Sequence, residues 1–122
     1  MTYLRFQSLQ PCHGTPSRLG IFQIAFQVRD AVETRAYDAD EIDQNLRWLQ
    51  IHLRSPNLSA ADRRAIFWFK QTAREPMKRI WAMKPYLEAY GYWIEMVKTW
   101  KPGLIIYEDG WQVAAKPWRD GR

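Results

Sequence analysis

The chain has 122 residues, which is enough for one domain with its own hydrophobic core and too few for two. A formal net charge of +5 makes it moderately basic, and its single cysteine excludes an internal disulfide. Seven Trp, six Tyr and five Phe are more rings than a core of this size buries, so we expect aromatic side chains on the surface. The sequence predicts one domain over residues 1–122.

The N-terminal residues show neither the basic start nor the apolar run of a signal peptide. The longest apolar stretches are far shorter than the roughly 20 residues that cross a bilayer. We therefore expect a cytoplasmic protein that does not contact a membrane.

The first third of the chain predicts a strand and then a helix. Residues 3–7 alternate, with Leu4 and Phe6 on one side, as in a half-buried strand. Residues 11–16 read as a loop, and Ser17 can cap a helix that starts at Arg18. Residues 21–28 fit both a strand alternation and a helical stripe; the cap favours the helix.

The middle of the chain predicts a helix, a strand and a second helix. Asp38 or Asp40 can cap the first helix, with Glu41 and Asp43 in its first turn. A helical stripe follows, and residues 55–57 end it. The stripe consists of Ile42, Leu46, Leu49 and Leu53.

Residues 65–70 are too aromatic and too short to favour a helix, and they predict a buried strand. Thr72 and Glu75 have the spacing of a capping box, which places Pro76 in the first turn of the next helix. That helix stops at Gly91, and we expect a kink at Pro85.

The last third predicts three strands in an antiparallel meander. Pro102-Gly103 suits the centre of a type II turn, and Asp109-Gly110 is a two-residue hairpin signal. The predicted fold class is therefore α+β. It comprises a mainly antiparallel sheet, formed by the N-terminal strand, a central strand near 65–70 and the C-terminal three-stranded meander, with about three helices packed on one face.

Several short motifs together resemble a group of small bacterial proteins of similar length. The resemblance covers nearly the whole chain and is carried by residues 3–6, 20–22, 68–70 with 73, 95–99, 102–103, 107–109 and 112–113. It implies a bacterial, single-domain, soluble protein, and it implies no activity, cofactor or site residue. Pro76 departs from the helix former expected at that position.

Candidate catalytic and metal-binding groups are sparse. Cys12-His13 could pair a nucleophile with a base, but neighbouring side chains point in different directions and no third group orients them. His52 suits the end of its helix, and two histidines with one cysteine make a zinc site unfavourable. No phosphate-binding loop or Ser/His/Asp set is present. The sequence favours a protein without catalytic residues, metal or cofactor.

Charge is divided unevenly along the chain. Residues 30–43 are mostly acidic, whereas residues 47–84 are mostly basic. A basic face attracts phosphates, although such residues more often form an ordinary solvated surface. The nucleic-acid-binding hypothesis assigns this role to Arg63, Arg64, Lys70, Arg74, Lys78 and Arg79.

Aromatic rings interleaved with cations fit three interpretations: a core, a protein interface, or a platform for unpaired bases. We expect a non-catalytic binding domain that acts through protein contacts or as a homodimer. Nucleic-acid binding is the first alternative, and a metal-dependent hydrolase or nuclease using Glu95, Glu108 and Asp109 is the second. The predicted protein interface consists of Trp93, Trp100, Tyr107, Trp111 and Trp118.

Overall fold

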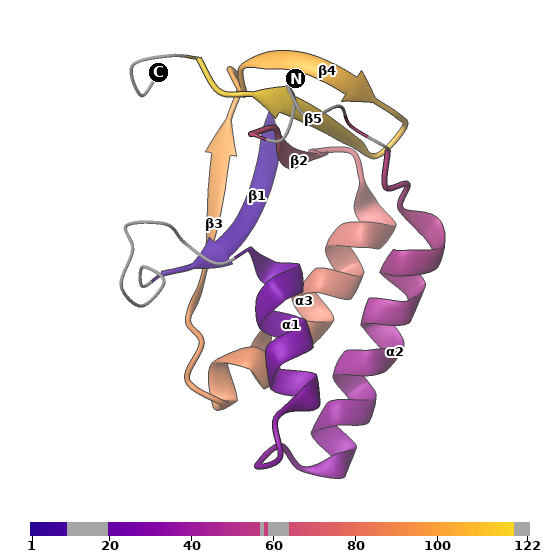
Figure 1. Ribbon diagram of the computed structural model, residues 1–122, viewed down its shortest axis with the longest axis vertical. Coiled ribbons are helices and arrows are strands. Elements are labelled where there is room, and N and C mark those ends of the chain that lie inside the picture. Colours follow the sequence, from indigo (N-terminus) through magenta and orange to yellow (C-terminus); the bar gives the residue numbers. More distant parts are fainter. Residues whose placement is uncertain (10–19, 57, 59–63, 119–122) are drawn as a thin grey trace.

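The computed structural model describes residues 1–9, 20–56, 58 and 64–118. Three helices and a five-stranded antiparallel sheet confirm the predicted α+β class within this part of the chain. Figure 1 shows the helices side by side, with the sheet along their left side and across the top. The elements are β1 (Tyr3–Ser8), α1 (Ile21–Asp30), α2 (Ala36–His52), β2 (Ile66–Lys70), α3 (Arg74–Ala89), β3 (Ile94–Thr99), β4 (Leu104–Glu108) and β5 (Gln112–Lys116).

The strand order is β3-β1-β2-β5-β4, so the predicted three-stranded meander is wrong. β4 and β5 form a hairpin, but β3 lies at the opposite edge and pairs with β1 from Tyr3↔Thr99 to Ser8↔Ile94. A turn signal determines a local change of direction, and it does not determine which strand becomes the neighbour. Here β1 takes β3 as its partner, and the two strands pair over six consecutive residues.

The sheet is joined weakly at its centre. β1 and β2 pair only through Tyr3↔Lys70 and Leu4↔Phe69, and beyond these residues the two strands diverge. The sheet thus consists of a β3-β1 ribbon and a β2-β5-β4 unit. In Figure 1, β3 runs up the view and β1 runs down beside it, while β4 and β5 lie across the top, which shows how strongly the sheet twists.

The core lies between the helices and the facing side of the sheet. The predicted stripe of α2 is confirmed for Ile42, Leu46 and Leu49, which are fully buried, and Phe6 of β1 joins them as expected. Burial of each such large apolar side chain contributes roughly 1.5–3 kcal/mol to folding. β2, predicted as a buried strand, buries only Phe69 fully.

Helix α1 confirms the helical interpretation of residues 21–28, but its start differs from the prediction. Gly20 occupies the N-cap position and donates its backbone N–H to Oε1 of Gln23 at 3.1 Å. The predicted cap is therefore wrong. Ser17 and Arg18 lie outside the described residues, as do Cys12 and His13.

Helix α2 begins before both predicted caps, because its first residue is Ala36. Asp38 lies within the first turn, and Asp40, Glu41 and Asp43 follow inside the helix. The helix ends at His52, three residues before the predicted stop.

Helix α3 begins at Arg74 with Ala73 as its N-cap and no side-chain cap, so the predicted capping box of Thr72 and Glu75 is absent. Pro76 lies in the first turn as predicted, and it is buried. The helix continues through Pro85, where the kink stays a prediction.

The end of α3 follows the sequence signal. Gly91 has a φ of +95°, and its N–H bonds the Glu88 carbonyl at 3.0 Å. The N–H of Tyr92 bonds the Leu87 carbonyl at 3.1 Å, which completes a Schellman motif.

The hairpin turn also differs in detail from its prediction. Asp109 and Gln112 close the turn through an N–H···O=C bond of 2.9 Å, so Gly110 and Trp111 occupy its centre. The Asp109 carboxylate accepts the backbone N–H groups of Trp111 and Gln112 at 2.9 and 3.0 Å. The Asp109 side chain therefore accepts hydrogen bonds from a turn whose centre lies one position later in the chain than predicted.

Candidate functional site

Two of the predicted interface residues lie at one corner of the sheet. Gly103 packs against the backbone of Lys116 and Pro117, and this contact brings the segment that begins β4 against the segment that follows β5. Trp100 stands three residues before Gly103 and is 77% exposed, whereas Trp118 is 48% exposed. We call the exposed side chains of Trp100, Leu104 and Trp118 the apolar corner.

The other three predicted interface residues are elsewhere. Trp93 is exposed just before β3, far along that strand from Trp100. The Tyr107 hydroxyl donates a hydrogen bond of 2.6 Å to the Asp109 carboxylate. The Trp111 ring packs within the chain, 5.6 Å from the ring of Trp48 on α2.

Trp111 belongs to an aromatic cluster that sequence reasoning missed. Trp48 stacks on His52 at 4.1 Å between ring centroids, and the Arg79 guanidinium lies 5.0 Å above the Trp48 ring. His52 and Trp48 are four residues apart on α2, a spacing that places them on one face. Arg79 and Trp111 come from distant elements, so no local pattern links them to this pair.

The predicted nucleic-acid-binding residues do not form one free basic face. Arg64, Arg74 and Lys78 are exposed, but Lys70 pairs with Glu108 at 2.6 Å and Arg79 stacks on Trp48. Arg63 lies outside the described residues. Nucleic-acid binding therefore stays a prediction, resting mainly on Arg74 and Lys78 of α3.

The three carboxylates of the hydrolase hypothesis serve separate contacts. Glu95 accepts a hydrogen bond of 2.7 Å from Gln7 on β1, whereas Glu108 pairs with Lys70 at the other edge of the sheet. Within the described residues, no group of three His, Cys, Asp or Glu side chains is placed to hold a metal ion. The described helices also include none that is both long and apolar enough to cross a membrane.

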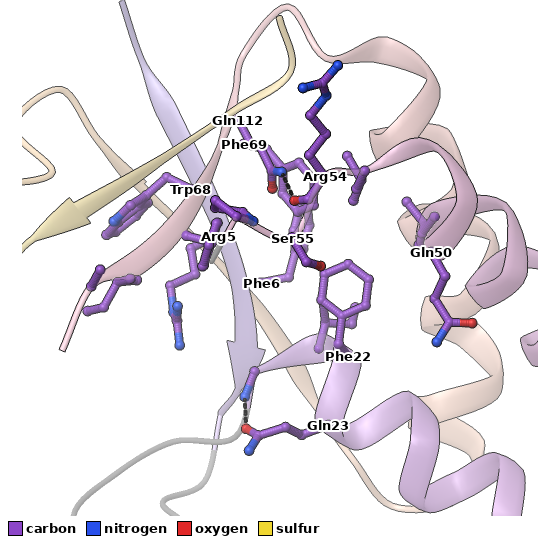
Figure 2. Close-up of a pocket in the computed structure, with 18 of the residues that line it drawn as sticks. Arg5, Phe6, Phe22, Gln23, Gln50, Arg54, Ser55, Trp68, Phe69 and Gln112 are labelled. Carbon is purple, nitrogen blue, oxygen red and sulfur yellow. Dashed lines mark hydrogen bonds between the residues drawn. The ribbon is translucent and has the colours of Figure 1, made fainter. Parts of the chain in front are cut away.

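A pocket of about 700 Å³ lies where β1 and β2 diverge, bounded by the start of α1 and the end of α2. This volume is within the usual range of small-molecule sites, roughly 300–1,000 Å³. Figure 2 shows its lining: Phe22 of α1 and Phe69 of β2, with Arg5 of β1 and Trp68 of β2.

The apolar part of the pocket comes from aromatic rings. The Phe22 and Phe69 rings lie 6.4 Å apart between centroids at an interplanar angle of 41°, and Phe22 is only partly buried. An apolar group that entered the pocket would cover ring surface that water now contacts.

Arg5 supplies a charged group at this pocket. Its Nε donates to Oε1 of Gln7 at 3.2 Å, and Gln7 in turn donates to Glu95, so a chain of hydrogen bonds fixes the guanidinium. Desolvation by burial lowers the pKa of Arg5 below its ordinary value. The guanidinium remains charged near neutral pH, but part of its hydration has been removed.

Trp68 also lines the pocket. Its indole Nε1 is buried and has no hydrogen-bond partner in the described part of the chain, although Trp68 as a whole is only partly buried. A buried N–H without an acceptor is unfavourable and unusual in a folded protein. Sequence reasoning missed both Arg5 and Trp68, because the divergence of β1 and β2 leaves no local signal.

Comparison of the chain with protein-family models, curated proteins and solved structures finds no match.

Proposed function

We propose that this chain is a non-catalytic binding domain that acts through protein contacts, and that its contact surface, the apolar corner, associates with a second copy of the chain. The supporting observation is the corner itself: Trp100, Leu104 and Trp118 are all about half or more exposed. Tryptophan is enriched among the residues that dominate binding energy at protein interfaces. Monomers rarely leave large apolar side chains gathered on one surface without a partner.

We assign the contact between the two copies to packing of side chains and not to the addition of a strand at the edge of the sheet. β4 is an edge strand, but its pairing with β5 is irregular between Ile105 and Tyr107. Such a bulge makes continuous pairing with a further strand unfavourable. Packing of the two Trp rings against the same rings of a second copy, about a two-fold axis, would bury the corner in both chains at once.

Sedimentation equilibrium tests the proposal directly. We expect the wild-type chain to form a dimer at concentrations up to about 500 µM, and Trp100→Ala or Trp118→Ala to weaken it about tenfold each. Trp93→Ala is the matched control, because Trp93 is 53% exposed but lies at the other end of β3. A wild-type monomer throughout this range, or an equal loss in the Trp93 variant, would refute self-association through the corner.

A further inference from the structure

Among the described residues, the charged side chains that line the pocket between β1 and β2 are all positive. Its described lining residues include two arginines, Arg5 and Arg54, and no Asp or Glu. Trp68 also lines the pocket, and its indole N–H is buried without an acceptor among the described residues. A pocket that offers donors and positive charge favours a ligand that brings acceptors and negative charge.

The guanidinium of Arg5 is oriented but not neutralised. Its Nε is bound to the amide oxygen of Gln7, and no ion pair joins it to a carboxylate in the described part of the chain. Among these residues, its two terminal nitrogens make no hydrogen bond. Two terminal N–H groups side by side match the two oxygens of a carboxylate.

Arg5 and Trp68 lie on the same face of the sheet. Tyr3 pairs with Lys70, and Arg5 and Trp68 are each two residues from this pair along their strands. Since side chains alternate between faces along a strand, both point to the side of Tyr3. Phe69, one residue away, points to the helix side and belongs to the core. The pocket thus joins a donor-bearing side to an apolar side through the gap between β1 and β2.

From this arrangement we propose that the pocket is a binding site for a small organic carboxylate with an aromatic or aliphatic body. The carboxylate accepts from the terminal nitrogens of Arg5, and the body lies against Phe22 and Phe69. The ligand would supply the counter-charge that Arg5 lacks. This site is separate from the apolar corner, so neither proposal depends on the other.

The first experiment uses wild-type protein and 1-naphthoate as the probe, followed in proton–nitrogen correlation spectra. We expect a saturable shift of the Trp68 indole N–H resonance, assigned by its loss in Trp68→Phe, with a Kd below about 1 mM. Two further ligands separate the contributions of the carboxylate and of the ring. Neutral 1-naphthalenemethanol keeps the ring without the carboxylate, and acetate keeps the carboxylate without the ring. Both should bind at least about tenfold more weakly. Equal affinity for the neutral analogue, or no shift of the Trp68 resonance, would overturn the proposal.

The second experiment tests the assigned donor. Arg5→Gln should weaken 1-naphthoate binding at least about tenfold. Arg74→Gln, an exposed arginine on α3 outside the pocket, should leave the affinity unchanged. Unchanged affinity in a folded Arg5→Gln variant would exclude the site as described. Trp100→Ala should retain full binding, which distinguishes this result from any failure of self-association.

Discussion

Gly103 stands directly against the carbonyl group of Lys116, where β4 begins and β5 ends. Its φ is +123°, a conformation that residues with a side chain rarely adopt. A Cβ at this position would overlap the Lys116 oxygen and lie 3.1 Å from the Cα of Pro117. The chain requires glycine here both for its backbone conformation and for this close approach.

Gly103→Ala should therefore lower the free energy of unfolding by at least about 2 kcal/mol, measured by urea denaturation. Gly110→Ala is the matched control, because a Cβ at Gly110 meets nothing within 4 Å and its φ is not positive. The control should change stability by less than about 0.5 kcal/mol. Equal effects of the two substitutions would contradict the required contact between Gly103 and Lys116.

The Asp109 carboxylate predicts a pH dependence of stability. Desolvation by partial burial acts to raise the pKa of this carboxyl, but the Tyr107 hydroxyl and the backbone N–H groups of Trp111 and Gln112 outweigh it and lower the pKa. A group with a depressed folded-state pKa stabilises the fold above its unfolded pKa, about 3.9 for Asp. This contribution is lost as pH falls through the lower, folded pKa.

Asp109→Asn should destabilise the protein by about 1–2 kcal/mol at pH 7, because hydrogen bonds to a charged group are lost. The difference between wild type and variant should shrink as pH is lowered from about 4 to 2, as measured by urea unfolding at each pH. Asp40→Asn, at an exposed position of α2, should cost less than about 0.5 kcal/mol. A wild-type-to-variant difference that stays constant down to pH 2 would argue against the role of this carboxylate.

The fold class could be predicted because its signals are periodic. Ile42, Leu46 and Leu49 recur at helical spacing, and this periodicity places them on the buried face of α2 wherever the helix begins. Leu4 and Phe6 alternate in the same way on β1. Each pattern predicts which side of a helix or strand is buried. The prediction does not depend on which other element covers that side.

Helix boundaries and strand neighbours could not be predicted because they depend on contacts between distant residues. The N–H of Arg35, at the start of α2, donates to the Tyr90 hydroxyl at 3.0 Å, so a side chain 55 residues away serves the helix end. Asp38 accepts from the same hydroxyl at 2.6 Å and does not cap its own helix. The pocket has the same origin, since it opens where β1 and β2 part after two pairs, and residues far apart in the sequence line it.

The variant Tyr90→Phe tests whether the start of α2 depends on the distant Tyr90 hydroxyl. The Tyr90 hydroxyl donates to Asp38 and accepts from Arg35, so its removal leaves two polar groups of α2 without their partner. We expect a loss of about 1–2 kcal/mol in the free energy of unfolding.

Tyr92→Phe is the control for this variant, because its hydroxyl makes only a long bond of 3.4 Å to Gln27. It should cost less than about 0.5 kcal/mol. If the two variants lost equal stability in urea denaturation, the link between α2 and Tyr90 would not contribute as the geometry indicates.

Trp111 and Trp100 belong to the same predicted interface but should respond differently to substitution. Trp111 packs against Trp48 inside the chain, and its ring is only partly exposed. Trp111→Ala removes this contact from beneath the aromatic cluster, so we expect a loss of about 2 kcal/mol or more in the free energy of unfolding. Trp100 is 77% exposed, and Trp100→Ala should change stability by less than about 0.5 kcal/mol.

The two variants together separate folding from association. Under conditions in which both are folded, sedimentation equilibrium should show a wild-type dimer constant for Trp111→Ala and a weakened dimer for Trp100→Ala. The converse result, a Trp111 variant of wild-type stability that no longer associates, would place the interface at the hairpin turn and not at the apolar corner. Because Trp48 is the neighbour of Trp111, Trp48→Ala should reproduce the loss of stability without changing the dimer constant.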